Sequence, residues 1–448
     1  MTYNAPRGLN DLLPASAHAH SWIDCVAGEV FSRYGYALIE TPLFEQTEVF
    51  VRGIGEATDV VGKEMFGVYS AAALNKLANG EPLKADEQMT LRPEGTAGVA
   101  RAVVQHNLVT TSSPVAKLWY AGSMFRHERP QKGRLRQFHQ IGLECIGAAE
   151  PTADAETIIV LMRFFEALGL PRDEMRLYIN SMGDAACRPV YRKTLREYIL
   201  DNSSALCEEC ARRADTNPLR AFDCKNPACV AVMANAPAIT AFLCADCAAH
   251  YVSVRALLDA AGISYEENPR LVRGLDYYTR TVFEVQVDAG LGAQNAIGGG
   301  GRYDGLIEKF GGKPTPGLGF AVGIERTLLA LEALGLCVGE PPELAVFVAA
   351  VDTNARAAAF SVAQMLRDAG ISAELDHQNR SLKSQLKLAD KLGVIWVVIL
   401  GPNELASGTA TLRCMQTHDE RRVALDELQN VISNVVQDDT LSSIQNLT

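Results

Sequence analysis

Residues 118–147 constrain the fold most, because they combine two apolar, alternating segments with a basic turn between them. Side chains alternate across a strand, so this pattern predicts an antiparallel hairpin. On the return strand, 137–146, one face is mostly apolar, and the other carries Gln140 and Glu144 on either side of Gly142. We expect the apolar face to meet a core and the polar face to form the floor of a site for a small polar ligand. A solvated face of an ordinary hairpin is the alternative interpretation.

The turn between the two strands, 126–136, is strongly basic. It holds five Lys or Arg residues against one Glu, a local charge of +4, in a chain of 448 residues whose formal net charge is −11. Whole-chain charge describes solubility better than it describes local contacts. The acidic total therefore argues against nonspecific nucleic-acid binding, whereas the basic turn remains compatible with one specific RNA partner.

The length and composition are those of a globular protein with two or three domains, since 48% of the residues are hydrophobic and 21% are charged. No apolar run reaches the ~18 residues of a membrane span, so no membrane association is predicted. The first residues lack a basic segment followed by an apolar one. No signal peptide is therefore predicted, and a cytoplasmic location is expected.

Two other segments place charged residues where ligands commonly bind. Glu94 sits where a predicted strand gives way to a helix that Thr96 can cap. Arg326 falls in the first turn of a helix that follows a glycine-rich strand, where exposed N–H groups favour anions. An ordinary turn acid and a simple glycine-rich strand are the alternatives. Residues 56–88, by contrast, are expected to be loop.

Four motifs together resemble one family. FRHERPQKGRLRQFHQIG, at 125–142, is similar to motif 2 of class II aminoacyl-tRNA synthetases, in the form found in histidyl-tRNA synthetases. TLRPEGT at 90–96 and LVRGLDYYTRT at 271–281 resemble signatures of the same family, and GLGFAVGIER at 317–326 resembles motif 3. The resemblance covers residues 6–400 and is specific because the motifs occur in combination.

The resemblance implies a fold class and a domain order. The catalytic domain, 1–335, is expected to be α+β and built on an antiparallel sheet, with a helical, cysteine-rich insertion at 186–262. After a proline pair, strands and helices alternate, which predicts a small α/β unit with a parallel sheet. The resemblance makes this unit an anticodon-binding domain at 341–436. Residues 437–448 are expected to form a flexible tail.

The resemblance also assigns roles around ATP and histidine. Histidine would react with ATP to give histidyl-adenylate and pyrophosphate, and would then pass to the 3′ end of tRNA(His). Catalysis at the α-phosphate is assigned to Arg126 and Arg273, and further ATP contacts are assigned to Glu128 and Arg326. The histidine-binding residues would be Glu94, Thr96, Gln140, Glu144, Tyr277 and Tyr278. In the basic turn, the residues that would contact the tRNA acceptor end are Arg129, Gln131 and Arg134.

Six of the eleven cysteines crowd into residues 207–247, where CEEC and CADC form two C-x₂-C pairs. Two such pairs can present four thiolates to Zn²⁺. The sequence therefore predicts a structural zinc site whose ligands would be Cys207, Cys210, Cys244 and Cys247. The alternative is a helical insertion in which cysteines act as small core residues.

The implied ligands are histidine, ATP, Mg²⁺ and tRNA(His), and a homodimer is implied because a helix, a strand and Pro42 resemble the dimer-forming motif 1. The alternative function is that of a synthetase-like regulatory paralogue, which binds histidine without charging tRNA. Such paralogues lack the terminal unit and usually lose the residue that matches Arg273, whereas this chain has both. A ligase with another acceptor would leave the basic stripe at 380–391 unexplained.

Overall fold

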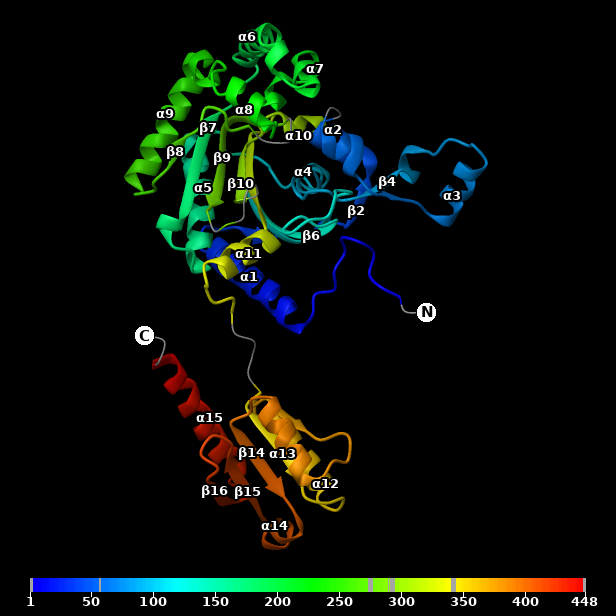
Figure 1. Ribbon diagram of the computed structural model, residues 1–448, viewed down its shortest axis with the longest axis vertical. Helices are drawn as coiled ribbons and strands as arrows, with labels where there is room; N and C mark the ends of the chain where they lie inside the picture. The colour runs from blue at the N-terminus through cyan, green and yellow to red at the C-terminus, as the bar shows by residue number, and fades with distance from the viewer. Residues whose placement is uncertain are drawn as a thin grey trace. The chain divides into compact units, whose positions relative to one another are not determined.

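The structure is a computed structural model that describes residues 3–55, 58–272, 277–288, 290, 295–339 and 344–445, with side chains up to residue 436. The chain divides into two compact units, Met1–Gly339 and Glu340–Thr448 (Figure 1). Each unit has its own hydrophobic core and is described by itself.

The predicted hairpin is present and lies inside the main sheet of the first unit. Its strands are β5 (Ala116–Phe125) and β6 (Gln137–Ile146), which pair antiparallel with Phe125 opposite Gln137. Among the described residues this sheet has eight strands, in the order β1-β5-β6-β11-β10-β9-β7-β8. All neighbours are antiparallel except β1 with β5 and β7 with β8. The expected α+β fold on an antiparallel sheet is therefore confirmed. The other strands are β1 (Ala37–Leu38), β7 (Met175–Ser181), β8 (Glu266–Glu267), β9 (Thr279–Val287), β10 (Ala296–Arg302) and β11 (Gly317–Gly323).

Helices bury both faces of this sheet. On one face α1, α5, α9 and α11 form a single core with the sheet, in which Ile141, Leu143 and Cys145 of β6 are buried as predicted. On the other face α4 packs against Tyr120 and Met124 of β5. This second face carries the polar residues of the hairpin, so α4 stands beside the expected site. The helices of this body are α1 (Pro14–Ser32), α2 (Thr47–Ile54), α4 (Thr96–Gln105), α5 (Pro151–Ala167), α10 (Leu306–Lys309) and α11 (Ile324–Ala333), with the 3-10 turn η3 (Arg172–Glu174).

The segment that was expected to be loop contains regular structure. Its elements are the π-helical turn η1 (Val60–Glu64), β3 (Gly67–Val68), α3 (Ala71–Ala78) and the 3-10 turn η2 (Ala85–Glu87). β3 joins β4 (Met89–Leu91), which also pairs with β2 (Phe44–Gln46). Figure 1 shows α3 standing away from the main sheet. The prediction of loop was wrong because elements this short show no measurable periodicity.

The helical insertion leaves the sheet after β7 (Figure 1). It contains α6 (Arg188–Asp201), α7 (Glu208–Thr216), α8 (Pro227–Met233) and α9 (Ala245–Ala260), with the 3-10 turns η4 (Ser203–Ala205), η5 (Pro218–Asp223) and η6 (Ile239–Phe242). A small separate core forms around Tyr191, Leu195 and Ile199 of α6. α9 instead belongs to the main core, through Val254 and Leu258. The insertion is thus attached to the sheet by its last helix.

The second unit has a mixed sheet rather than the wholly parallel one expected. Within its described residues the strand order is β13-β12-β14-β15-β16, and only β12 with β13 and β12 with β14 are parallel. The prediction from sequence missed the last two strands. They form a hairpin, so no helix separates them, and the alternation of strands and helices that predicted the other strands is absent there. The strands are β12 (Val346–Ala350), β13 (Ala373–Leu375), β14 (Trp396–Leu400), β15 (Thr409–Cys414) and β16 (Glu420–Ala424).

Helices pack on this second sheet, and the last of them enters the expected tail. They are α12 (Arg356–Asp368), α13 (Leu382–Lys391), α14 (Pro402–Ser407) and α15 (Leu428–Gln445). α15 is helical well past residue 437, where the tail was expected to begin. Across the described parts of both units, no helix is long and apolar enough to cross a bilayer.

Candidate active site

A cavity of about 290 Å³ lies beside the hairpin. Its wall includes residues from β6, β10 and β11 and from the N-terminal ends of α4 and α11. The structure thereby brings together segments from the four motifs singled out in the sequence. Nine of the predicted site residues line the cavity, namely Glu94, Thr96, Arg126, Glu128, Arg134, Gln140, Tyr277, Tyr278 and Arg326.

The gap at Gly142 is filled by a side chain of the protein and not left for a ligand. Tyr120, on the neighbouring strand β5, lies opposite Gly142. A Cβ at Gly142 or at Gly95 would collide with the Tyr120 ring. These glycines therefore allow an aromatic side chain to sit between the sheet and α4. Gln140, two residues before Gly142 and on the same face of β6, does line the cavity.

Glu94 caps the helix that begins beside it. Its two carboxylate oxygens accept the backbone N–H groups of Thr96 and Ala97, at 2.8 and 2.9 Å. Thr96 is consequently the first residue of α4 and not its cap. The Glu94 side chain is only 4% exposed, and burial raises the pKa of this carboxyl. A cationic ligand group beside Glu94 would offset that burial.

Glu144 lies behind the wall of the cavity. It is 1% exposed, and its carboxyl accepts hydrogen bonds from the Thr96 hydroxyl at 2.7 Å and from the Tyr303 hydroxyl. A Cβ at Gly319 would collide with the same carboxyl. Burial raises the pKa of Glu144 to about 8, although the hydrogen bonds from Tyr303 and Thr96 lower it. Sequence reasoning missed Tyr303, although this residue directly follows the glycine-rich strand β10.

Three arginines line the cavity, Arg126 and Arg134 from the basic turn and Arg326 from α11. Arg126 donates from Nε to the Pro93 carbonyl at 2.9 Å and lies over the Phe138 ring at 5.3 Å. Arg326, in the first turn of α11, donates to the carbonyls of Gly133 and Ala296 at 3.2 and 3.3 Å. These contacts hold both side chains in place without neutralising them. Planar, fixed guanidinium groups are suited to phosphate oxygens.

Burial lowers the pKa of Arg326, and the nearby positive charge of Arg134 lowers it further. Arg134 is in turn paired with Glu128 across 2.6 Å. The positive charges of Arg126, Arg134 and Arg326 therefore repel one another, and Glu128 and Glu284 offset this repulsion in part. An anionic ligand would relieve this repulsion.

The basic turn divides into two parts. Arg134 faces the cavity, whereas Arg129 and Gln131 are exposed. The turn is closed by paired backbone hydrogen bonds between Gln131 and Arg134, at 2.9 and 3.0 Å. Two of the three predicted tRNA contacts are thus accessible to a large partner, while the third is held beside Glu128. Arg273, the other predicted catalytic arginine, lies outside the described residues.

Comparison with known proteins agrees with this geometry. The family described as Histidyl-tRNA synthetase matches residues 8–327. The chain belongs to the histidyl-tRNA synthetase family. A histidine–tRNA ligase from Anaeromyxobacter dehalogenans is 46% identical over 433 residues, which is 97% of this chain and 100% of the relative. One from Halothermothrix orenii is 43% identical over 436 residues, 97% of this chain and 100% of the relative.

Solved structures give the same relationship. A crystal structure of apo histidyl-tRNA synthetase from S. aureus has a TM-score of 0.78 and 34% identity, covering 96% of this chain and 100% of that chain. A Bacillus halodurans protein described as an ATP phosphoribosyltransferase regulatory subunit/histidyl-tRNA synthetase shares the fold at 21% identity, with a TM-score of 0.61 over 90% of this chain and 99% of that chain. The second unit matches the family described as Anticodon binding domain over residues 345–435. The family assignment thus extends through both units.

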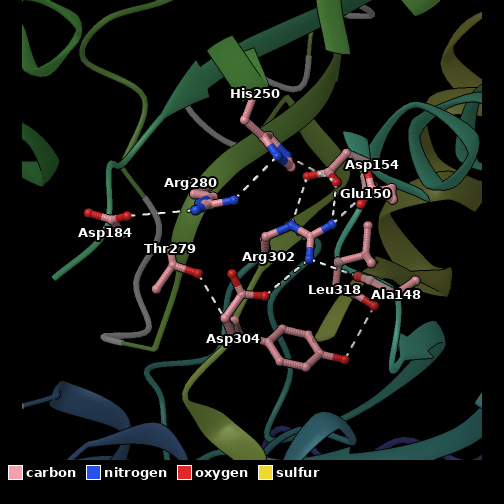
Figure 2. Close-up of polar contacts among 11 residues, drawn as sticks. Ala148, Glu150, Asp154, Asp184, His250, Thr279, Arg280, Arg302, Asp304 and Leu318 are labelled. Carbon is pink, nitrogen blue, oxygen red and sulfur yellow. Dashed lines mark hydrogen bonds and ion pairs between the residues drawn. The ribbon is translucent and has the colours of Figure 1, made fainter. Parts of the chain in front are cut away.

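Two polar contacts of this family member, one half-buried and one fully buried, were not predicted from its sequence. Glu325 accepts the backbone N–H of His139 at 3.0 Å and contacts its Nδ1 at 2.8 Å, tying α11 to β6. Arg302 is fully buried, and Figure 2 shows its guanidinium between Asp154 and Asp304. Burial acts to raise the pKa of Asp154, but His250 and Arg302 together lower it.

The zinc site predicted from the sequence is wrong in its ligand set. The structure divides its four cysteines between two clusters. Cys207 and Cys210 group with Cys224 and Cys229, and the other two cysteines join an acid in a second group. That second group consists of Asp184, Cys187, Cys244 and Cys247. The error arose because Cys187 and Asp184 lie outside the cysteine-rich stretch, so only the fold could bring them to it.

Proposed function

We propose that the chain joins histidine to tRNA(His) with ATP as the energy source. In the first step a carboxylate oxygen of histidine attacks the α-phosphorus of ATP, and pyrophosphate leaves. In the second step a hydroxyl of the terminal ribose of tRNA attacks the acyl carbon of histidyl-adenylate, and AMP leaves. The observation that carries the proposal is one cavity that combines fixed guanidinium groups with buried carboxyl and phenol groups.

The guanidinium groups act by positioning and by electrostatic stabilisation. Arg126 is assigned to the α-phosphate and the histidine carboxylate, Arg326 to the γ-phosphate, and Arg273 to charge on the opposite side of the α-phosphate. Support for the first two is that their side chains line the cavity and are already held by backbone carbonyls. Glu128, which pairs with Arg134, is assigned to ATP as well.

The buried acids and phenols are assigned to histidine. Glu94 and Thr96 would hold the ammonium group, and Gln140 supports this because its Oε1 is buried without a hydrogen-bond partner among the described residues. Tyr277 and Tyr278, which line the cavity, would select the imidazole ring, and Glu144 would act from behind the wall by holding Thr96 and Tyr303. A buried hydrogen-bonding site strongly rejects analogues that lack the matching group.

Mg²⁺ is proposed to enter with ATP and to neutralise phosphate charge. The donor types present fit such an ion, since Glu128 and Glu284 bring carboxylate oxygens to the cavity. Glu284 lies on β9, and the neighbouring strand β10 carries Ala296 and Gly298, which also line the cavity. We therefore assign the ion to the side of the cavity that β9 and β10 form.

Charging of tRNA is favoured over the regulatory alternative. The second unit matches an anticodon-binding family, and the full-length relatives at 43–46% identity are histidine–tRNA ligases. The exposed Arg129 and Gln131, with Arg134 behind them, are proposed contacts of the acceptor end. A homodimer and a cytoplasmic location are proposed by family resemblance.

The test is ATP–pyrophosphate exchange with each amino acid in turn. We expect exchange with histidine alone, and Arg126→Ala should abolish it. The matched control is Arg33→Ala, an exposed residue directly after α1, which should exchange as the parent does. Absence of histidine-dependent exchange would refute the proposal, and exchange without transfer to tRNA would favour the regulatory alternative.

A further inference from the structure

The two cysteine clusters of the insertion are nested in the chain. The inner cluster uses Cys207, Cys210, Cys224 and Cys229, and the outer cluster uses residues on either side of them. Asp184 and Cys187 follow β7, where the chain enters the insertion, while Cys244 and Cys247 begin α9, where it leaves. The inner cluster thus connects parts of residues 207–229, which we call the tip of the insertion. The outer cluster connects the two ends of the insertion, where the chain enters and leaves it.

The sulfur atoms are spaced as they would be around a tetrahedral ion. Within each cluster the candidate ligand atoms all lie within 4.8 Å of one another. Zinc with Zn–S bonds of about 2.3 Å places its sulfur ligands roughly 3.8 Å apart. Cys207 and Cys224 have their Sγ atoms 3.9 Å apart. A disulfide bond of about 2.05 Å is therefore not the arrangement present.

Both C-x₂-C pairs sit at the start of a helix in the same way. Cys207 is the N-cap of α7 and Cys244 is the N-cap of α9, and the second cysteine of each pair lies in the first turn. The backbone N–H of Cys207 donates to Cys229 Sγ at 3.2 Å, and that of Cys244 donates to Cys187 Sγ at 3.0 Å. Helix N-termini and N–H donors stabilise thiolates, which are the form that binds a metal.

The outer cluster also has the surrounding contacts of a metal site. Asp184 Oδ1 accepts the backbone N–H of Ala186 at 2.9 Å and contacts Cys187, while Oδ2 lies 3.7 Å from Arg280 (Figure 2). One carboxylate oxygen thus faces the thiols and the other faces a cation. Three thiolates and one carboxylate around Zn²⁺ leave a net charge of −2, which Arg280 partly offsets.

The insertion has only a small core of its own. Besides Cys210, Cys229 and two alanines, that core buries Tyr191, Leu195, Ile199, Met233 and Ile239, and the helices that carry the two cysteines are short. Four of the seven clustered cysteines are almost fully buried, although the remaining three are partly exposed. Small units with small cores generally need disulfides or metals. Simple core packing does not explain why seven cysteines converge in two groups of defined spacing.

We propose that the insertion binds two structural zinc ions, an inner one on Cys207, Cys210, Cys224 and Cys229, and an outer one on Asp184, Cys187, Cys244 and Cys247. Closed four-ligand sites of this kind are structural, because they leave no position open for a substrate. Thiolate-rich tetrahedral sites select zinc over Mg²⁺ and Ca²⁺. The outer ion fastens both ends of the insertion to the catalytic unit, and the inner ion orders its tip.

The experiment measures zinc in the full-length chain, purified without chelator, by elemental analysis and native mass spectrometry. We expect two zinc ions per chain. Cys224→Ser with Cys229→Ser should remove one of them, and Cys187→Ser with Cys244→Ser should remove the other. Cys25→Ser with Cys337→Ser is the matched control, because both cysteines are exposed and outside the clusters. That pair should keep both ions.

Thiol alkylation of the unmutated chain gives a second readout that does not depend on variants folding. The seven clustered cysteines should be protected in the chain as purified and should react after chelation, and added Zn²⁺ alone should restore protection. Chain that contains no zinc and takes none up would overturn the proposal, as would disulfide bonds within the clusters. If the chain holds one zinc ion, the two double variants show which site binds it. The site whose cysteines can be replaced without loss of zinc would then be refuted.

Discussion

Replacing Glu144 by glutamine should change how the stability of the catalytic unit depends on pH. Glu144 is 1% exposed and its pKa is raised from 4.5 to about 8, chiefly by burial. The unfolded chain releases this proton near its ordinary pKa, whereas the folded chain keeps it until about pH 8. Between these values the folded state binds more protons, so the free energy of unfolding falls as pH rises.

The size of the effect follows from the pKa shift. Each unit of pKa difference corresponds to about 1.4 kcal/mol, so the full shift costs the folded state on the order of 5 kcal/mol by pH 8. Glu144→Gln removes the titration but keeps the volume of the side chain. Hydroxyl groups can both donate and accept, so Tyr303 and Thr96 can still bond to the amide. The variant should therefore match the parent near pH 5 and exceed it in stability by several kcal/mol near pH 8.

The assay is urea denaturation from pH 5 to pH 8.5, followed by tryptophan fluorescence, to which Trp119 in β5, beside β6, contributes. The difference in free energy of unfolding between variant and parent isolates Glu144, because the other titrating groups are common to both. Glu29→Gln, exposed on α1, is the matched control and should show no such trend. A difference for Glu144→Gln that stays constant across this range would show that Glu144 has no raised pKa in the folded chain.

Three other substitutions test separate parts of the structure. Arg302→Ala should destabilise the chain by about 3–5 kcal/mol in urea denaturation, because it leaves Asp154 buried without its cation, whereas the exposed Arg176→Ala should cost under about 1 kcal/mol; equal effects would contradict this. Arg326→Ala should lower the rate of ATP-dependent pyrophosphate exchange by roughly 10- to 100-fold, which is the contribution of a hydrogen bond to a charged group. Histidine affinity, measured by calorimetry, should not change, and a loss confined to histidine affinity would count against the proposed role of Arg326. Arg273→Ala should abolish adenylate formation while histidine still binds, and near-normal exchange would refute its assignment.

The hairpin could be predicted from local pattern because its strands are long and alternate cleanly. Ile141 and its neighbours on the same face are buried, and Gln140 on the other face reaches the cavity, as the alternation requires. The resemblance then identified most of the lining residues. It placed Glu144 in the pocket, whereas the structure places it behind Thr96 and Tyr303.

The remaining features depend on contacts between distant segments. Arg302 and Asp154 are 148 residues apart in the sequence, so no local pattern of charges predicts their ion pair. Tyr120 fills the gap at Gly142 only because α4 closes over it, which the strand pattern cannot show. The ligands of the cysteine clusters were misassigned for the same reason: C-x₂-C spacing identifies a pair, but chain topology decides which residues complete it.

The most direct test of the proposed function is transfer of histidine to tRNA. Purified chain would be incubated with ATP, Mg²⁺, labelled histidine and transcribed tRNA(His), and the 3′-terminal nucleoside would be isolated after nuclease digestion. We expect the label to be joined through an ester to that terminal ribose. It should be absent when the tRNA is first treated with periodate and absent with other tRNAs. Histidyl-adenylate formation without labelled tRNA would contradict the proposed function.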